Sequence, residues 1–255
     1  MATDAPYNIK ARFIGGRGAT KHDNFVMAHG EMSEEEYRAF LKSAIEAWLP
    51  VLPEGALLYM AMDWRHSLDL QLAARELRLE HINTAVWCKT AGMGSYYRSA
   101  HEFWLVFRKP GASHRNNIQL GRFGRMRSNV WAGYSLSGFK ATRAQQMKDH
   151  PTPKPAALLI DLIKDSTARG ETVLDPFAGS GTCMIAAQAV GRLACLVELD
   201  PRYIDVILRR YHRLFGRHAV HRETGMTLDE LGRFRAASAG APPLALPPPK
   251  GGERP

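Results

Sequence analysis

Two short stretches of this chain combine residue types that could do chemistry together. The first, "DAPY" at residues 4–7, joins a carboxylate, a small residue, a proline and an aromatic ring. Pro6 fixes its own φ and keeps Ala5 extended, so the Asp4 carboxylate and the Ala5 carbonyl can point towards one site. These two acceptors suit a planar base that carries an amino group, with Tyr7 stacked on the ring. Taken alone, such a tetrapeptide is more often a simple turn.

The second stretch, "LDPFAGSGTC" at residues 174–183, is typical of a strand that ends in a glycine-rich loop and opens a helix. Gly179 and Gly181 let the backbone approach a ligand closely. Glu198 ends the next predicted strand, where a carboxylate can accept both hydroxyls of a ribose. The pattern favours a nucleoside ligand, with a ligand-free turn as the alternative. The loop residues assigned to this site are Asp175, Phe177, Gly179, Ser180, Gly181 and Thr182.

The same loop indicates which nucleoside it would hold. It lacks the Lys-Ser/Thr pair that follows the glycines of a Walker sequence. It also departs from G-x-G-x-x-G, because the residue three after Gly181 is Met184. A dinucleotide bound through its pyrophosphate is therefore disfavoured. S-adenosylmethionine, which has no phosphate, suits such a loop.

Helices and strands that could position these residues alternate along the chain. A capping box, Ser33 with Glu36, precedes the first helical repeat of apolar residues. This alternation predicts an α/β fold with a doubly wound, mainly parallel sheet. The predicted helices are 32–49, 66–79, 154–167, 181–192 and 202–216, and the predicted strands are 56–63, 82–89, 101–109, 171–175 and 193–200.

Composition points to a nucleic-acid partner. The chain has 255 residues, 45% of them hydrophobic, which is enough for one large α/β domain. Its net charge is +9, and residues 109–148 hold eight Lys and Arg but no Asp or Glu. This block reads as a loop region that faces a polyanion. Residues 236–255 are rich in proline and are predicted to be a disordered tail.

Several other features are expected to be absent. The N-terminal residues contain no apolar signal segment, and no stretch approaches the roughly 18 apolar residues that span a bilayer. Cys88, Cys183 and Cys195 form no C-x-x-C pair and are predicted to be reduced thiols. No histidine spacing indicates a metal site. Together these features predict a cytoplasmic protein without a metal.

Considered together, the two motifs resemble the amino-group DNA methyltransferases, with their D-P-P-Y and F-x-G-x-G signatures. The catalytic motif precedes the cofactor motif here, an order similar to that of the β-class. The segments "MDWRH", "VWCKTAGMGSYYRSAHEFWLVFRK" and "HRNNIQLGRFGRMRSNVW" look most like phage- and prophage-type adenine methylases. The resemblance implies a Rossmann-like methyltransferase domain over residues 1–235 and a target-recognition region at 109–149.

The resemblance also implies roles for individual residues. Asp4, Ala5, Pro6 and Tyr7 would be catalytic, and S-adenosylmethionine would be the cofactor. In the family, the segment that matches "HPTPKP" helps hold the methionine end of the cofactor, which assigns Lys154 and Pro155 to that site. Double-stranded DNA would be the partner, and a homodimer stays open because relatives are often dimers. The candidate DNA contacts are Arg115, Arg122, Arg125 and Arg127, the last three pointing one way if their stretch is extended.

The chain departs from the family at two places. Ala5 replaces the first proline. This change is expected to be tolerated, because the hydrogen bond to the amino group needs only the backbone carbonyl. Only three residues precede Asp4, so the usual strand is expected to be a stub and the chain a truncated form.

Alternatives for the reaction also stay open. One is methylation of the cytosine amino group, which usually accompanies Ser in place of Asp4. Another is an inactive relative that only binds DNA or a partner chain, and RNA or a protein amide ranks lower as a substrate. Asp63, Trp64 and Arg65 would line the pocket or form an ordinary turn. The residues expected to be structural or to face DNA, rather than catalytic, are Trp87, Lys89, Arg98 and Glu102.

Overall fold

The computed structural model describes residues 1–9, 27–94, 96–134 and 154–238, which fall into two compact units, Met1–Asp200 and Pro201–Pro255. The second unit contains helices α6 (Pro201–Phe215) and α7 (Leu228–Ser238). Helix α7 extends three residues into the segment predicted to be a tail, and the rest of that tail lies outside the described residues. The predicted extent of the methyltransferase domain stays a prediction.

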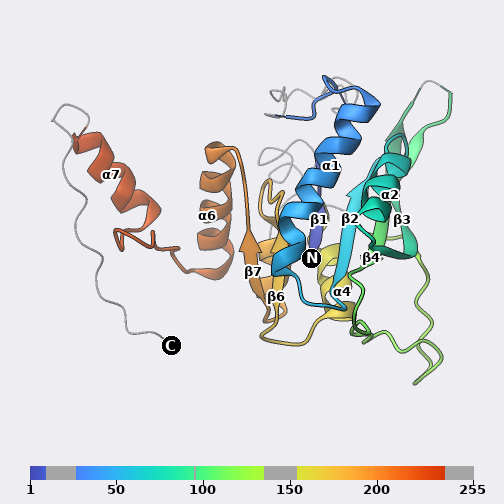
Figure 1. The fold of residues 1–255 in the computed structure, drawn as a ribbon. Coiled ribbons are helices and arrows are strands. Elements are labelled where there is room, and N and C mark those ends of the chain that lie inside the picture. Colours follow the sequence, from blue (N-terminus) through green and yellow to red (C-terminus); the bar gives the residue numbers. More distant parts are fainter. Residues whose placement is uncertain (10–26, 95, 135–153, 239–255) are drawn as a thin grey trace. The chain divides into compact units, whose positions relative to one another are not determined.

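The first unit is built on a mixed sheet with the order β1-β2-β4-β3-β5. Strand β1 pairs with β2 in parallel, β4 is antiparallel to both of its neighbours, and β5 is parallel to β3. Two further strands, β6 and β7, form a parallel pair that lies beside β1 (Figure 1). The strands are β1 (Ala2–Asp4), β2 (Leu57–Met62), β3 (Glu80–Met93), β4 (Ser99–Arg108), β5 (Val130–Trp131), β6 (Thr172–Asp175) and β7 (Leu193–Leu196).

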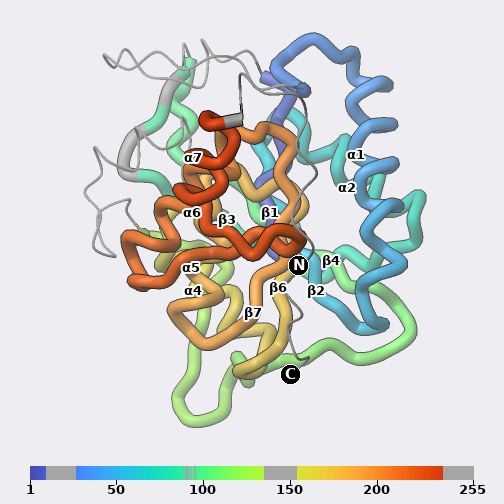
Figure 2. The backbone as a smooth tube through the Cα atoms, turned by 90° about the vertical axis from the view of Figure 1, so that its left-hand side faces the viewer, coloured from blue at the N-terminus to red at the C-terminus, as the bar shows by residue number. Residues whose placement is uncertain are grey.

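Helices cover both faces of the strands, and alternate residues of β2 show how. Figure 2 shows α1 and α2 on one side of the strands and α4 and α5 on the other. Leu58, Met60 and Met62 pack with α1 and α2, while Tyr59 and Ala61 pack with α4 and α5. The helices are α1 (Glu34–Trp48), α2 (Ser67–Glu76), α4 (Ala156–Ser166) and α5 (Thr182–Ala189), and a short 3₁₀ turn, η2 (Leu49–Val51), follows α1. The α/β fold is confirmed, and the sheet differs from the expectation in the antiparallel β4.

Helix α1 begins where its sequence predicts. The Ser33 side chain accepts from the Glu36 backbone N–H at 3.2 Å, and the Glu36 carboxylate accepts from the Ser33 N–H at 2.8 Å. Such a cap is worth about 1 kcal/mol. The buried residues Tyr37, Leu41 and Ile45 then recur on one face of the helix. No helix of the described residues is long and apolar enough to cross a membrane.

The carboxyl ends of β1, β2, β6 and β7 lie at one edge of the unit. Asp4 is in register with Ala61, and Thr3 reaches across to β6, where its hydroxyl donates to the Asp175 carboxylate at 2.7 Å. Ligands of α/β proteins bind at this edge, outside the carboxyl ends of the strands. Both sequence motifs are therefore brought to the same place.

Candidate active site

Asp4 is the last residue of β1, and its two carboxylate oxygens have different partners. The Tyr7 hydroxyl donates to Oδ1 at 2.7 Å, and the Lys154 ammonium donates to Oδ2 at 2.5 Å. The Asp4 side chain remains 26% exposed, so a ligand can reach it. Ala5 is buried among apolar side chains, and the Pro6 carbonyl accepts from the Tyr37 hydroxyl at 2.7 Å, which holds the turn in place.

A second carboxylate, Glu102 on β4, completes a buried cluster around Asp4. Glu102 accepts from Lys154 at 3.1 Å and from the Tyr7 hydroxyl at 3.3 Å, and it forms an ion pair with Lys89 of β3. The side chains of Glu102 and Lys154 are only 9% and 5% exposed. Two carboxylates and two ammonium groups therefore share one site with Tyr7. We call these five residues, Asp4, Tyr7, Lys89, Glu102 and Lys154, the catalytic cluster, after the role that the sequence predicts for Asp4 and Tyr7.

The protonation of the catalytic cluster depends on burial and on neighbouring charge. Burial raises the pKa of Asp4, Glu102 adds to this rise, and Lys154 opposes it. Burial also disfavours the charge on Glu102, but Lys154 and Lys89 outweigh it and lower the pKa of Glu102. The two carboxylates likewise outweigh burial at Lys154 and raise its pKa. Burial, followed by the two carboxylates, raises the pKa of Tyr7, so this hydroxyl stays a hydrogen-bond donor.

The loop between β6 and α5, which the sequence predicts to hold the cofactor, is held in place by the carboxylate of Glu198. Glu198 Oε2 accepts from the Gly179 N–H at 2.7 Å, and Oε1 accepts from the Asp200 N–H at 2.9 Å. Gly179 has φ 50° and Gly181 has φ 76°, in the left-handed region that a residue with a Cβ adopts only with strain. The glycine loop and the acid after β7, which the sequence predicted separately, are therefore in direct contact.

Replacing Glu198 with glutamine should weaken the binding of S-adenosylmethionine roughly tenfold to hundredfold, because one charged acceptor of the loop and of a ribose is lost. Isothermal titration calorimetry measures this affinity. Glu171→Gln is the matched control, since Glu171 also accepts a backbone N–H, from Ala168, but lies before β6. Equal losses in both variants would contradict a ligand role for Glu198.

Asp175 links β6, which leads into the glycine loop, to β1, which ends at Asp4. Its Oδ1 accepts from the Thr3 hydroxyl at 2.7 Å and from the Phe177 N–H at 3.2 Å. Burial raises the pKa of this carboxyl to about 7, far above its ordinary value. The folded state therefore favours the protonated form.

The raised pKa of Asp175 determines the direction in which the stability of the protein changes with pH. The contribution of Asp175 is complete below about pH 4 and is lost as pH rises towards 7. From pH 5 to pH 7 the protein should lose about 2 kcal/mol relative to Asp175→Asn, which retains an acceptor oxygen but does not ionise. Urea unfolding of both proteins at several pH values gives this difference. Parallel stability curves would show that Asp175 does not titrate in this range.

The residues of the loop fit a nucleoside cofactor. Phe177 packs its ring against Trp48, with centroids 5.3 Å apart, and this contact fixes the start of the loop. Ser180 and Thr182 are buried at the start of α5, and Pro155 is the N-cap of α4. Lys154 was predicted to hold the cofactor, and its ammonium forms ion pairs with Asp4 and Glu102. Contact of Lys154 with the methionine end of the cofactor stays a prediction.

The four candidate DNA-binding arginines lie far from Asp4. Residues 109–128 follow β4 at the amino end of β2, where the Lys109 N–H donates to the Ala56 carbonyl at 3.0 Å (Figure 1). Arg127 pairs with Asp165 at 2.7 Å near the C-terminal end of α4, whereas Lys154 precedes the N-terminus of that helix. Helix α4 has 11 residues, so its two ends lie ~16 Å apart.

Local geometry also corrects two expectations for this block. Residues 119–125 form turns rather than an extended row, since the Arg122 N–H donates to the Gln119 carbonyl and the Arg125 N–H donates to the Arg122 carbonyl. Acidic side chains from outside the block also compensate part of its charge, because Arg115 pairs with Glu171 at 2.7 Å. DNA contact by the four arginines stays a prediction, and Lys140, Arg143 and Lys148 lie outside the described residues.

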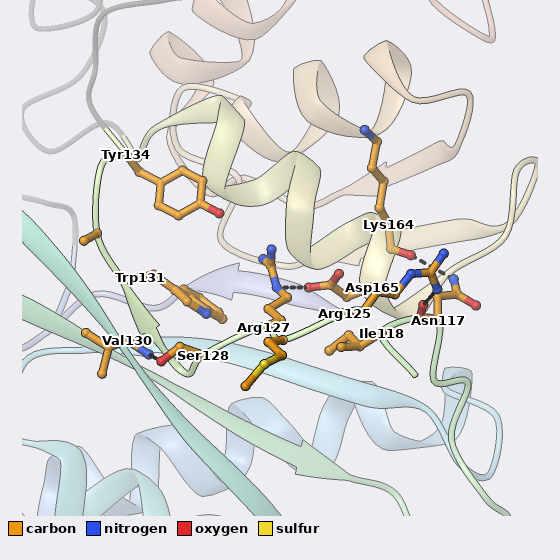
Figure 3. Close-up of a pocket in the computed structure, with 12 residues that line it drawn as sticks. Asn117, Ile118, Arg125, Arg127, Ser128, Val130, Trp131, Tyr134, Lys164 and Asp165 are labelled. Carbon is orange, nitrogen blue, oxygen red and sulfur yellow. Dashed lines mark hydrogen bonds and ion pairs between the residues drawn. The ribbon is translucent and has the colours of Figure 1, made fainter. Parts of the chain in front are cut away.

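A pocket of about 540 Å³ lies beside α4 at this end of the unit, and Figure 3 shows the residues that line it. Arg127 points to Asp165 across it, and its guanidinium lies 6.0 Å from the Trp131 ring centroid. The Tyr134 hydroxyl donates to Asp161 at 2.5 Å, and the Asn117 amide donates to carbonyls at the end of α4. The pocket is therefore a junction that fastens residues 117–134 to the helix.

Sequence analysis did not place Glu102 and Lys89 beside Asp4. Both were expected to be structural or to face DNA, which stays a prediction, and the structure places both in the cluster around Asp4. A signal was present, because the charged Glu102 directly precedes the apolar run "FWLVF" in a strand that should be buried. Trp87 and Glu102 are direct register partners in neighbouring strands, which the sequence alone does not reveal.

Comparison with known proteins places this geometry in a known class. The chain is 26% identical over 225 residues to the Type II methyltransferase M.HpaI of Haemophilus parainfluenzae, covering 82% of this chain and 67% of that protein. It is 21% identical to the Type II methyltransferase M2.MboI of Moraxella bovis, covering 83% and 79%.

Solved structures of DNA methylases also superpose on this chain. TTHA0409 of Thermus thermophilus, described as a candidate DNA modification methylase, superposes with a TM-score of 0.55, 26% identity and 84% and 86% coverage. Its complex with S-adenosyl-L-methionine gives a TM-score of 0.57, 24% identity and 83% and 85% coverage. The PvuII cytosine-N4-specific DNA methyltransferase shares the fold, with a TM-score of 0.63, 16% identity and 82% and 77% coverage.

The fold and the site define a methyltransferase that uses S-adenosyl-L-methionine. The chain belongs to the N6-adenine and N4-cytosine DNA methylase family, whose model, described as DNA methylase, matches residues 1–209. The predicted class and cofactor are confirmed.

Proposed function

We propose that this chain transfers a methyl group from S-adenosyl-L-methionine to the exocyclic amino group of adenine in double-stranded DNA. The observation that carries the proposal is the Asp4 carboxylate, partly exposed and held by Tyr7 and Lys154 beside the glycine loop. When bound, the cofactor supplies a methyl group on a sulfonium that a nucleophile can displace. Gly179, Gly181 and Glu198 would hold it.

Asp4 would act on the amino group of the base. The adenine amino nitrogen is a poor nucleophile because its lone pair is delocalised into the ring. The Asp4 carboxylate and the Ala5 carbonyl would accept its two N–H bonds, favour a tetrahedral nitrogen and offset the positive charge that develops there. Tyr7 and Lys154 each use one lone pair of the carboxylate, and further lone pairs remain for the substrate.

The target base must leave the duplex stack to reach Asp4, which costs a few kcal/mol. Stacking on an aromatic ring would return roughly 1–3 kcal/mol of this. Tyr7 was assigned that role from the sequence, and its hydroxyl also holds the Asp4 carboxylate in position. The ring and the hydroxyl of Tyr7 therefore have separate tasks in the proposed mechanism.

Asp4 also bears on the choice of base. The family includes enzymes for the amino groups of adenine and cytosine. Asp in place of Ser at the first position of the tetrapeptide favours adenine, and cytosine N4 is the second candidate. Because M.HpaI and M2.MboI are Type II methyltransferases, we assign the chain to the modification half of a restriction-modification system.

The test is transfer of labelled methyl from S-adenosyl-L-methionine to unmethylated duplex DNA, followed by nucleoside mass spectrometry. The expected product is N6-methyladenine. A preparation of Asp4→Ala, purified in parallel, controls for contaminating methylases. N4-methylcytosine as the product would overturn the adenine assignment. No product from a protein that binds the cofactor would instead favour the inactive, DNA-binding relative.

A further inference from the structure

The β3–β4 hairpin extends past the other strands at the edge where Asp4 lies. The pairing of β2 with β4 stops at Met62 and Phe103, whereas β3 and β4 remain paired as far as Met93 and Ser99 (Figure 1). The tip of this hairpin therefore projects from the carboxyl end of β2, the side from which a base must approach Asp4.

Two glycines shape the hairpin. A Cβ on Gly92 would lie 2.5 Å from the Ser99 backbone, and a Cβ on Gly94 would lie 2.0 Å from the Tyr97 carbonyl oxygen. The two chain segments thus approach more closely than any side chain permits. The close approach keeps the described part of the tip narrow and leaves Tyr96 and Tyr97 on its surface.

Three aromatic side chains gather at this tip. Tyr96 is 88% exposed and Tyr97 is 78% exposed, and their ring centroids are 4.5 Å apart. Trp64, which follows β2, is 48% exposed and donates its indole N–H to the Ser99 hydroxyl at 3.2 Å. We call Trp64, Tyr96 and Tyr97 the edge aromatic cluster.

Two arginines accompany the edge aromatic cluster. Arg98 is exposed directly beside Tyr97 in the chain. The Arg65 guanidinium lies 4.9 Å from the Trp64 ring centroid and also pairs with Asp63 at 2.8 Å. Exposed aromatic rings beside arginine are the combination that binds nucleic acid, with rings stacking on bases and guanidinium groups on phosphates.

We propose that the edge aromatic cluster is a base-stacking contact for DNA at the target site, with Arg98 on a neighbouring phosphate. The inference deepens the proposed function and rests on it. DNA is favoured over a second copy of the chain because the cluster lies at the catalytic edge and because its exposed charge is cationic. The cluster replaces stacking that neighbouring bases lose when the target base leaves the duplex.

Fluorescence anisotropy with unmethylated duplex DNA at several salt concentrations tests this. The double variant Tyr96→Ala, Tyr97→Ala should bind at least tenfold more weakly at every salt concentration, with an unchanged salt slope. The double variant Tyr96→Phe, Tyr97→Phe should bind like the parent. Arg98→Gln should reduce the salt slope by about one. The matched control is Val51→Ala with Leu193→Ala, exposed residues near the amino ends of β2 and β7, which should have no effect.

Calorimetric binding of S-adenosylmethionine verifies that each variant is folded. Unchanged DNA affinity in the tyrosine-to-alanine variant, or an equal loss in the control, would overturn the inference. The inference would also be overturned if the tyrosine-to-alanine variant sedimented as a monomer, the parent as a dimer, and the variant still bound DNA. The cluster would then join two copies of the chain. Failure of the proposed function has a separate signature, since the unsubstituted protein would bind DNA but transfer no methyl.

Discussion

Asp4→Ala is expected to lower the rate of methyl transfer on the order of 10³-fold, because it removes the acceptor placed at the amino group of the base. Binding of S-adenosylmethionine should change little, since the loop and Glu198 are untouched. Single-turnover transfer of labelled methyl to duplex DNA separates this chemical step from product release.

Asp4→Asn is the informative companion to the alanine variant. It retains an oxygen acceptor for Tyr7 but removes the negative charge beside Lys154. We expect its rate to lie between those of the parent and the alanine variant, because one neutral acceptor remains. A rate equal to that of the parent in Asp4→Ala would show that the reaction takes place elsewhere on the chain.

Glu102→Gln should have the second largest effect, although Glu102 does not face the substrate. The change removes the carboxylate that pairs with both Lys89 and Lys154, and it leaves Asp4 as the negative partner of Lys154. Breaking a buried ion pair in this way costs about 3 kcal/mol of folding stability. Transfer should slow by roughly 10-fold to 100-fold, because Lys154 and Tyr7 both lose a contact that holds them against Asp4.

A pH profile distinguishes this positioning role from a loss of stability. Glu102 raises the pKa of Asp4, so its neutralisation should lower that pKa. Asp4 must be ionised to accept from the base, and activity therefore falls as pH drops through its pKa. The acid limb of the profile should move to lower pH in Glu102→Gln. Glu80→Gln removes an exposed ion pair with Arg108 and is the matched control, with an expected change below about 0.5 kcal/mol. An unmoved acid limb would contradict electrostatic coupling between Glu102 and Asp4.

Local sequence signals predicted most of the elements. The capping box at Ser33 marked the start of α1, and the apolar run at residues 56–63 marked β2. These features depend on residues that are close in sequence, so the chain encodes them directly. The glycine loop and Glu198 were predicted for the same reason, since each follows a strand.

The features that were missed depend on pairing between distant segments. The antiparallel pairing of β4 with β2 joins segments far apart in the chain, and no local signal specifies it. Glu102 enters the catalytic cluster only because this arrangement sets it opposite Trp87, close to Lys154 of another segment. The arginines at 115 and 127 were counted as uncompensated because their acidic partners, Glu171 and Asp165, lie outside the counted interval.

The catalytic cluster contains two acids and two bases, so its formal charges cancel when all four are ionised. A balanced group of this kind produces little field beyond its own dimensions, and it neither attracts nor repels the phosphate backbone from a distance. Long-range steering of DNA must therefore come from the surface cations that give the chain its charge of +9. Raising the ionic strength should slow the encounter with DNA while leaving the rate of the bound complex unchanged.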